Sequence, residues 1–280
     1  MLSNLFIEDI VRKTLMEDLG RGFDITGNLL IPGDALGRAV LRARQPGVLC
    51  GLIPALTAFS LTDPDFSFEV EAQDGDIIQP GDTIAAIEGP ARALLTAERT
   101  ALNFLIHLSG IATLTMAFVD EVEGTGARIT CTRKTLPGLR SIQKYAVLTG
   151  GGSNHRYGLD DAILIKDNHI ALAGSITDVL DRARSGAGHT VKIEIEVDTL
   201  PQLEEVLKSG KADIVMLDNF TLDDLKTAVS MAKGRIVTEA SGGVNLSTVR
   251  GIAETGVDYI SAGALTHSAA ALDIGLDVEI

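Results

Sequence analysis

The sequence predicts an α/β protein, with a β-rich part near the N-terminus followed by a parallel sheet built from repeated βα units. Residues 66–71 alternate between apolar and polar side chains, which is the period of a half-buried strand. After residue 126, short β-rich runs alternate with helical stretches. From residue 192 onward these runs start roughly twenty-odd residues apart, the length of a βα unit. Right-handed crossovers would curl such units into a barrel or a doubly wound sheet.

The composition excludes several classes of protein. With 280 residues, of which 45% are hydrophobic and 22% charged, the chain is long enough for one large α/β barrel or two smaller cores. Acidic side chains outnumber basic ones by 38 to 24, so the net charge of −14 disfavours binding to DNA or to anionic membranes. Aromatic residues make up only 4%, which argues against stacking platforms for single-stranded nucleic acid.

The N-terminal elements follow from their periodicity. A helix is expected over residues 4–19, because apolar side chains recur there at every fourth position. Residues 38–90 are expected to form a small β-rich domain, with turns at Asp74-Gly75 and Pro80-Gly81. The charged residues near the start, among them Glu8 and Asp9, interrupt any apolar run, so no signal peptide is expected.

Residues 100–119 contain no Asp, Glu, Lys or Arg and could span a bilayer by length alone. Polar side chains such as Asn103 and His107 lie within this stretch, and no Lys/Arg cluster flanks it. We therefore expect a helix buried in protein, at a subunit interface, in preference to a transmembrane span.

The C-terminal strands and helices carry recognisable end signals. Ser175 and Thr221 each precede an Asp by three positions, like capping boxes, and Pro201 fits the first turn of a helix at 200–209. The expected strands are Arg128–Thr132, Ala162–Ile165, Lys192–Val197, Ile214–Leu217, Arg235–Thr238 and Tyr259–Ser261.

Polar side chains cluster just after these strands, where barrels and open α/β sheets bind their ligands. The segment 128–166 holds seven Lys and Arg against two Asp, a local charge of +5 in a chain whose remainder is −19. This concentration predicts a site for a small polyanion, because Arg pairs carboxylates and phosphates through two hydrogen bonds. The alternative is a solvated basic loop, which the glycines at 150–152 beside His155 and Arg156 make less attractive.

Two glycine loops after the last two strands, at 241–243 and 261–263, are each expected to lead into a helix and together predict phosphate binding, although each alone could be an ordinary turn. Glu196 and Asp218 follow adjacent strands and could bind Mg²⁺ together with ligand phosphates. They could equally form ion pairs with the neighbouring Lys and Arg. The two cysteines, Cys50 and Cys131, show neither metal-ligand spacing nor a disulfide framework, which suits a reducing cytosol.

Several motifs resemble those of the quinolinate phosphoribosyltransferase family and cover nearly the whole chain. The blocks that carry this resemblance are Glu17–Gly20, Ala97–Thr100, His107–Thr113, Thr132–Arg140, Lys144–Val147, Gly150–Arg156, Leu164–His169, Glu194–Val197, Met216–Asn219, Glu239–Gly243 and Gly263–His267. One departure is Phe23, which stands before Asp24 where the family usually has Gly, and it puts a local turn in doubt.

The resemblance implies an N-terminal α/β sandwich at residues 1–111, rejoined by 268–280, and an incomplete barrel of about six strands at 112–267. It implies that phosphoribosyl is transferred from phosphoribosyl pyrophosphate to quinolinate with decarboxylation, giving nicotinate mononucleotide for NAD synthesis in the cytoplasm. Mg²⁺ is the implied cofactor, held by Glu196 and Asp218. The implied assembly is a homodimer with composite sites, with further assembly to a hexamer left open.

The resemblance also implies the site residues. Lys134, Lys166, Glu196 and Asp218 would be catalytic. The side chains that would bind quinolinate are Arg99, Arg133, Lys134, His155, Arg156 and Lys166. The remaining substrate-binding positions would be Thr135, Glu196, Asp218, Ser241, Gly242, Gly243, Ser261, Ala262, Gly263, Ala264 and His267.

Three other functions are weighed against this one. A related pyrophosphorylase-like protein linked to molybdenum uptake keeps the fold, but such relatives look altered in the block at 164–169. A Schiff-base aldolase would use Lys166 as its nucleophile on a phosphate-binding barrel. A non-catalytic nucleotide sensor would bind the phosphoribosyl donor without turnover.

Overall fold

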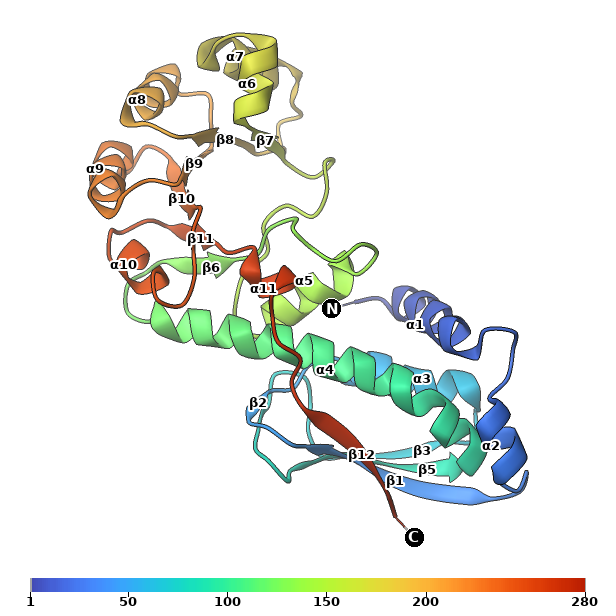
Figure 1. Ribbon diagram of the computed structural model, residues 1–280. Helices are drawn as coiled ribbons and strands as arrows, with labels where there is room; N and C mark the ends of the chain where they lie inside the picture. Colours follow the sequence, from blue (N-terminus) through green and yellow to red (C-terminus); the bar gives the residue numbers. More distant parts are fainter. Residues whose placement is uncertain (1, 280) are drawn as a thin grey trace. The chain divides into compact units, whose positions relative to one another are not determined.

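The computed structural model describes residues 2–279, which fold into two compact units (Figure 1). The first unit comprises the residues up to 116 together with 141–151 and those from 269 onward. The second comprises residues 117–140 and 152–268. The chain therefore leaves the first unit and returns to it twice.

The first unit is built on a four-stranded antiparallel sheet in the order β12-β1-β5-β3. Its strands are β1 (Leu36–Ala43), β3 (Ser67–Val70), β5 (Thr83–Pro90) and β12 (Ile274–Glu279). A separate antiparallel pair joins β2 (Gly47–Val48) to β4 (Ile77–Ile78). The final strand of the chain thus pairs with the first, which holds the C-terminal segment to this unit.

In Figure 1, α3 and α4 lie over one face of this sheet. The first unit has five helices in its described residues. They are α1 (Asn4–Leu19), α2 (Ile25–Leu30), α3 (Leu52–Thr62), α4 (Ala91–Glu121) and α5 (Arg140–Thr149). The predicted helix at 4–19 is confirmed. The stretch expected to be β-rich also contains α3, whose Phe59 is fully buried.

The apolar stretch at 100–119 belongs to the long helix α4. Within the described residues, α4 is the one helix long and apolar enough to cross a membrane, and 56% of that apolar window is buried. Two of its buried polar side chains have internal partners. The Ser109 hydroxyl accepts a hydrogen bond from the backbone N–H of Cys50 and donates one to the Cys50 carbonyl. The Thr115 hydroxyl donates to the carbonyl of Ile111. These contacts are typical of a core helix, although the hydroxyl of Thr100, also buried in α4, has no hydrogen-bond partner.

The second unit contains a six-stranded parallel sheet in the order β6-β11-β10-β9-β8-β7, which is the predicted incomplete barrel. Its strands are β6 (Arg128–Thr130), β7 (Ile163–Ile165), β8 (Ile193–Val197), β9 (Ile214–Asp218), β10 (Val237–Ser241) and β11 (Tyr259–Ser261). Figure 1 shows them as a curved row with helices along its outer side. These helices are α6 (Asp167–Ala173), α7 (Ile176–Gly186), α8 (Leu200–Ser209), α9 (Leu222–Ala232) and α10 (Val249–Ala253); α11 (Ala264–His267) follows the last strand.

The helix-start signals read from the sequence are largely confirmed. Ser175 and Asp178 form a reciprocal capping box, and Pro201 lies in the first turn of α8. The Thr221 side chain accepts a hydrogen bond from the Asp224 backbone N–H. These caps satisfy N–H groups that the helices leave without an internal partner.

One predicted strand was misplaced. The sequence favoured a strand at 235–238, but β10 runs from Val237 to Ser241. Gly234 adopts a positive φ of 72°, so the chain is still turning there, and Arg235 donates to the Leu207 carbonyl. Glu239 consequently lies inside the strand and is only 4% exposed, although the sequence placed it after the strand.

Candidate active site

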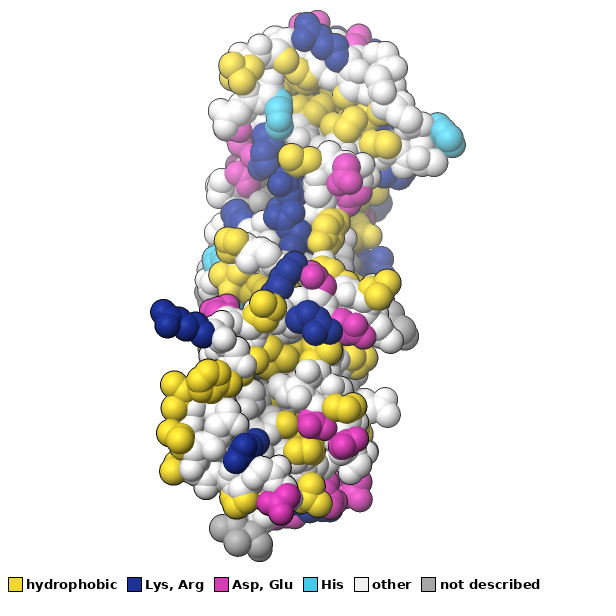
Figure 2. Space-filling model, turned by 90° about the vertical axis from the view of Figure 1, so that its right-hand side faces the viewer, with side chains coloured by type: hydrophobic (Ala, Val, Ile, Leu, Met, Phe, Trp, Pro, Cys, Tyr) yellow, Lys and Arg dark blue, Asp and Glu magenta, His cyan; other side chains and the backbone are white. Residues whose placement is uncertain are grey.

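A cavity of about 340 Å³ lies at the carboxyl ends of the parallel strands in the second unit. Asp218, Ser241 and Ser261 are the last residues of β9, β10 and β11, and Lys166 directly follows β7. The side chains that line the cavity are Thr132, Arg133, Lys134, His155, Arg156, Leu164, Lys166, Glu196, Met216, Asp218, Glu239, Ser241 and Ser261. Figure 2 shows a row of Lys and Arg side chains, coloured dark blue, on the surface of this unit.

Two arginines in this cavity have unmet hydrogen-bonding capacity. The Nε atoms of Arg133 and Arg156 are buried and have no hydrogen-bond partner. Arg156 is anchored through Nη1, which donates to the Ala162 carbonyl at 3.0 Å. Burial and the neighbouring charge of Arg133 lower the pKa of Arg156, while Glu194 and Asp161 act in the opposite direction. Two clustered guanidinium groups with free N–H donors form a site for a carboxylate or phosphate.

Lys134 is held against the loop that follows β11. Its backbone carbonyl accepts a hydrogen bond from the Thr266 hydroxyl at 2.9 Å. A Cβ atom on Gly263 would lie 2.9 Å from Cδ of Lys134, so in this conformation the lysine chain lies close against the backbone of residue 263. The glycine at position 263 therefore allows the Lys134 side chain to lie close to the backbone of the loop.

An acidic group stands at the mouth of the cavity. Carboxylate oxygens of Glu196, Asp198 and Asp218 lie within 4.8 Å of one another. Lys166 Nζ contacts Glu196 Oε2 at 2.5 Å, so the ion pair that the sequence left open is formed. Asn219 adopts a positive φ of 56° and donates from its side chain to Asp218 at 2.6 Å. This turn fixes the direction of the Asp218 carboxylate.

The loop after β10 packs tightly against that same turn. Gly242 has a positive φ of 90°, and a Cβ atom there would lie 2.1 Å from Oδ1 of Asn219. Only glycine fits this position. The loop continues to Val249 before α10 begins, so it does not lead directly into a helix as the sequence suggested. The loop after β11 does, because Gly263 is the N-cap of α11.

A deeper layer of three charged side chains lies beneath the basic groups. Nε2 of His155 contacts Oε2 of Glu194 at 2.9 Å and Oε1 of Glu239 at 3.7 Å. The side chains are 10%, 6% and 6% exposed, respectively. His155 was expected to donate to a bound anion, and in the structure its Nε2 faces carboxylates of the chain itself. Burial, followed by the charge of Glu194, raises the pKa of Glu239 to about 7.

The structure thus gathers most, though not all, of the predicted residues around one cavity. Thr135 lies nearby but accepts a hydrogen bond from Arg140 Nε at 3.2 Å. His267 is exposed and contacts Ser268. Predicted positions in the adjoining loops that do not line the cavity are Gly242, Gly243, Ala262, Gly263 and Ala264. Arg99 is exposed on α4 in the first unit and does not line it either.

Sequence reasoning missed Glu194 and Glu239 as members of the site. Glu194 appears in a strand whose other residues are mostly apolar, and Glu239 lies next to the apolar Ala240. A carboxylate in a buried strand is costly without a partner. A carboxylate within or beside an apolar strand segment was therefore the sequence signal that could have identified these two residues. Thr132, Leu164 and Met216 also line the cavity and carry no comparable signal in the sequence.

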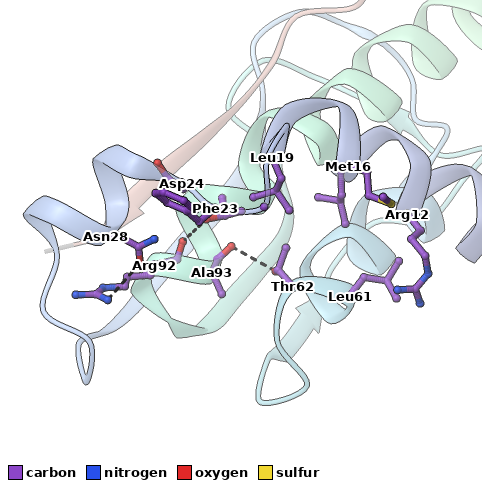
Figure 3. Close-up of a pocket in the computed structure, with 13 residues that line it drawn as sticks. Arg12, Met16, Leu19, Phe23, Asp24, Asn28, Leu61, Thr62, Arg92 and Ala93 are labelled. Atoms are coloured by element: carbon purple, nitrogen blue, oxygen red, sulfur yellow. Dashed lines mark hydrogen bonds between the residues drawn. The ribbon is translucent and has the colours of Figure 1, made fainter.

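A second cavity of about 340 Å³ lies in the first unit and collects none of the predicted site residues (Figure 3). Leu19 and Phe23 face Thr62 of α3 and Arg92 of α4 across it. Arg92 donates to the Asn28 side chain at 3.3 Å. The turn that Phe23 put in doubt is made by Gly22, with a φ of 120°, and Phe23 is 60% exposed beside it.

Comparison with known families matches both parts of the chain. Residues 24–109 match the N-terminal domain of quinolinate phosphoribosyl transferase, and residues 111–277 match its C-terminal domain. A nicotinate-nucleotide pyrophosphorylase (carboxylating) of Mycobacterium leprae is 45% identical over 275 residues, covering 96% of each chain. A probable enzyme of the same name from Bacillus subtilis is 42% identical, covering 100% of this chain and 96% of that protein.

Solved structures show the same similarity in three dimensions. The nicotinate-nucleotide pyrophosphorylase of Francisella tularensis superposes with a TM-score of 0.95 at 39% identity, covering 100% of this chain and 98% of that one. The corresponding protein of Ehrlichia chaffeensis gives a TM-score of 0.94 at 42% identity, covering 99% of both chains. Sequence profile, relatives and fold agree over the whole length, and the chain belongs to the quinolinate phosphoribosyltransferase family.

Proposed function

We propose that this protein transfers phosphoribosyl from phosphoribosyl pyrophosphate to the ring nitrogen of quinolinate, releasing pyrophosphate and CO₂ and giving nicotinate mononucleotide. The reaction is a pentosyl transfer in the de novo synthesis of NAD. The single observation that carries this assignment is the pair of buried, unpartnered Nε donors of Arg133 and Arg156 in the cavity. Quinolinate carries two carboxylates, and these would satisfy donors that are costly to leave unmade.

The other cavity residues suit the remaining steps. Lys134 supplies a further cation beside the loop of Gly263, where pyrophosphate charge has to be bound. Breaking the glycosidic bond builds positive charge on the ribose, which the Glu196 carboxylate stabilises. After transfer, the ring nitrogen is cationic and stabilises the electron pair that the breaking C–CO₂ bond leaves on the adjacent ring carbon, which then takes up a proton. The decarboxylation therefore needs no organic cofactor.

Mg²⁺ is proposed as the metal. The carboxylate oxygens of Glu196, Asp198 and Asp218 are the hard ligands that Mg²⁺ prefers, and one or two of them suffice when donor phosphates complete the site. Bound there with the phosphates of the donor, the ion would neutralise charge on the leaving pyrophosphate. Glu196 would then exchange its contact with Lys166 for one with the metal, which frees the lysine for an anionic substrate. Loss of activity on full chelation of divalent ions is the expected result.

The proposed assembly is a homodimer with composite sites, and further assembly to a hexamer is left open. Arg99 is exposed on α4, as a side chain that serves a second copy of the chain would be. Location in the cytoplasm is supported by the two thiols, Cys50 and Cys131, both buried. The net charge of −14 supports small-molecule substrates in preference to nucleic acid or a membrane surface.

The alternatives have less support. The relatives named above are pyrophosphorylases, which does not favour a molybdenum-linked paralogue. Lys166 pairs with Glu196 at 2.5 Å and is 46% exposed, whereas a Schiff-base lysine is typically desolvated. A sensor that binds the donor without turnover would leave the carboxylates of Glu196, Asp198 and Asp218 and the arginine pair without a role in chemistry.

The deciding experiment compares quinolinate with nicotinate, each supplied with phosphoribosyl pyrophosphate and Mg²⁺. Pyrophosphate and CO₂ are measured together. Quinolinate should be preferred in kcat/KM by about 30- to 1,000-fold, because nicotinate leaves buried arginine donors unpaired. Equal efficiency for both acids, or donor binding without turnover of either, would contradict the assignment.

A further inference from the structure

The two buried arginines of the cavity come from two separate loops of the second unit. Arg133 lies in the first basic loop, residues 131–139, between β6 and α5. Arg156 lies in the second basic loop, residues 152–162, between α5 and β7. A ligand with two anionic groups can pair both guanidinium groups only if the loops keep one fixed spacing. The contacts that set this spacing are therefore part of the binding machinery.

Like charges oppose that spacing. Burial, and then the charge of Arg133, lowers the pKa of Arg156, so the two guanidinium groups are close enough to repel each other. The Nε atoms of both are buried, and repulsion between charges is stronger in a buried site than in water. The two basic loops therefore need a link that holds them together before an anion binds.

Arg140 makes such a link. It is the first residue of α5 and the last residue of the second unit before the chain returns to the first. Its Nε donates to Oγ1 of Thr135 in the first basic loop at 3.2 Å, and its Nη1 donates to the Tyr157 carbonyl in the second at 3.1 Å. Its guanidinium carbon also lies 6.0 Å from the centre of the Tyr157 ring, a cation–π contact. Arg140 is half-buried and does not line the cavity.

The second basic loop is closed on itself, so one bond can position all of it. The Asp161 carboxylate accepts hydrogen bonds from the backbone N–H groups of Tyr157 at 2.5 Å and Gly158 at 2.9 Å. Nη1 of Arg156 donates to the Ala162 carbonyl at 3.0 Å. A bond to the Tyr157 carbonyl therefore also positions Arg156, the residue directly before it.

We propose that Arg140 is a positioning residue, which sets the spacing of Arg133 and Arg156 by tying the first basic loop to the second. Thr135, expected from the sequence to bind substrate, is in this arrangement the acceptor through which Arg140 holds the first loop. The consequence for quinolinate rests on the function proposed above, whereas the link between the loops does not.

The first test needs no substrate. Arg140→Met removes the donors and keeps an unbranched side chain. Amide hydrogen exchange in peptides covering residues 152–162 should become at least about threefold faster than in the wild-type protein. Arg128→Met is the matched control, because Arg128 also lies 6.0 Å from a tyrosine ring, that of Tyr259, and donates to its hydroxyl at 3.4 Å. Arg128 begins β6 at the amino end of the sheet and does not line the cavity, so this change should leave the exchange unaltered.

The second test compares ligands with two carboxylates and with one. Arg140→Met should raise KM for quinolinate by about 10- to 100-fold, whereas the inhibition constant of nicotinate should change by less than about threefold. KM for the phosphoribosyl donor should also change by less than about threefold, because Lys134 has its own anchor in the Thr266 hydroxyl. Arg128→Met should change none of these constants. A general loss of stability would not alter the preference between the two acids.

Three further variants separate the link from the charge of Arg140. Arg140→Lys keeps the positive charge but donates from a single nitrogen, so it should recover little of the affinity for quinolinate. Thr135→Val should raise KM for quinolinate by about 3- to 10-fold, and Thr135→Ser should restore it. In the Arg140→Met protein, Thr135→Val should add less than about twofold, because the bond that it removes is already absent.

Three outcomes would overturn the proposal. One is unchanged exchange of the second basic loop in Arg140→Met. Another is full recovery of quinolinate affinity in Arg140→Lys, which would mean that the charge alone matters. The third is an equal loss for quinolinate, nicotinate and the donor in a folded variant. If the wild-type protein shows no preference for quinolinate, the function proposed above fails, and the exchange measurement still decides whether Arg140 links the two loops.

Discussion

The four cationic side chains of the cavity differ in how they are held, which sets the effect of removing each. Lys134 lies against Gly263, and Lys166 pairs with Glu196. Both lysines are exposed, so Lys134→Ala and Lys166→Ala should fold normally. Each should lose about 30- to 1,000-fold in kcat/KM, since a charge-assisted contact is worth roughly 2–4 kcal/mol.

Steady-state kinetics and thermal melting of the two variants check this expectation. Lys226→Ala is the control, because Lys226 is an exposed lysine on α9 that pairs only with Asp223 in the same helix. Near-wild-type kinetics for both cavity variants would mean that these basic residues form a solvated loop and do not bind substrate.

Glu239 should make the folded protein less stable as the pH rises. Burial, and then the charge of Glu194, raises the pKa of Glu239 to about 7 from an ordinary value of 4.5. The folded state therefore binds the proton more tightly than the unfolded state does. The stabilisation is complete below the unfolded pKa and is lost as the pH rises through about 7.

Unfolding by urea, followed at intervals from about pH 4.5 to about pH 8, measures this effect. The decrease attributable to Glu239 should be on the order of 2–3 kcal/mol, and Glu239→Gln should abolish it. A wild-type curve parallel to that of Glu239→Gln over the whole range would refute the assignment.

The sequence predicted the cationic half of the site much better than its acidic layer. Arg133, Lys134, Arg156 and Lys166 stand out because positive charge is scarce in an acidic chain. Glu194 is one carboxylate among many, and its significance depends on a histidine from a distant segment. Only the packing of β8 and β10 around β9 brings those groups together.

At the scale of elements, α4 and the C-terminal segment meet at a single glycine. A Cβ atom on Gly110 would lie 2.0 Å from the Ala270 carbonyl oxygen, and two residues on, the Leu272 N–H donates to the Ile106 carbonyl at 3.0 Å. Gly110→Ala should therefore force these backbones apart and destabilise the protein by roughly 2–4 kcal/mol, despite alanine's better helix propensity.

The matched control is Gly186→Ala at the end of α7, where an added Cβ would meet nothing within 4 Å. That change should be neutral or stabilise the protein by up to about 1 kcal/mol. The free energies of unfolding in urea compare the two. Equal effects would mean that the C-terminal segment adjusts freely on α4.

Elements were predicted well where the sequence carries an end signal. The strand at 259–261 and the helix at 200–209 were placed correctly, the latter through Pro201. The helix α3 was missed because Leu52–Thr62 is apolar on several faces and shows no helical period. The strand β10 was placed two residues early, because Arg235 and Ile236 read as strand while the chain is still leaving a turn.

At the scale of the whole molecule, the α/β class and the six-stranded incomplete barrel are confirmed by the sheet order and by the family match. The boundary expected between residues 111 and 112 stays a prediction, and α4 runs through it without a break from Ala91 to Glu121. The association of chains stays a prediction too, because a surface becomes an interface only through its partner.

The role of Arg99 in a dimer can be tested by mixing two inactive variants. Arg99→Ala and Lys134→Ala should each be nearly inactive alone. If Arg99 of one chain completes the quinolinate site of the other, a mixed dimer has one site with both changes and one site with neither. Random exchange makes about half of the dimers mixed, so about one quarter of wild-type activity should return.

Exchange of subunits is followed with chains of different mass. The control is a mixture of Lys226→Ala with Lys134→Ala, whose activity should equal the average of the two variants measured alone. If exchange occurs and the Arg99 mixture recovers nothing, Arg99 acts within its own chain or has no part in the site.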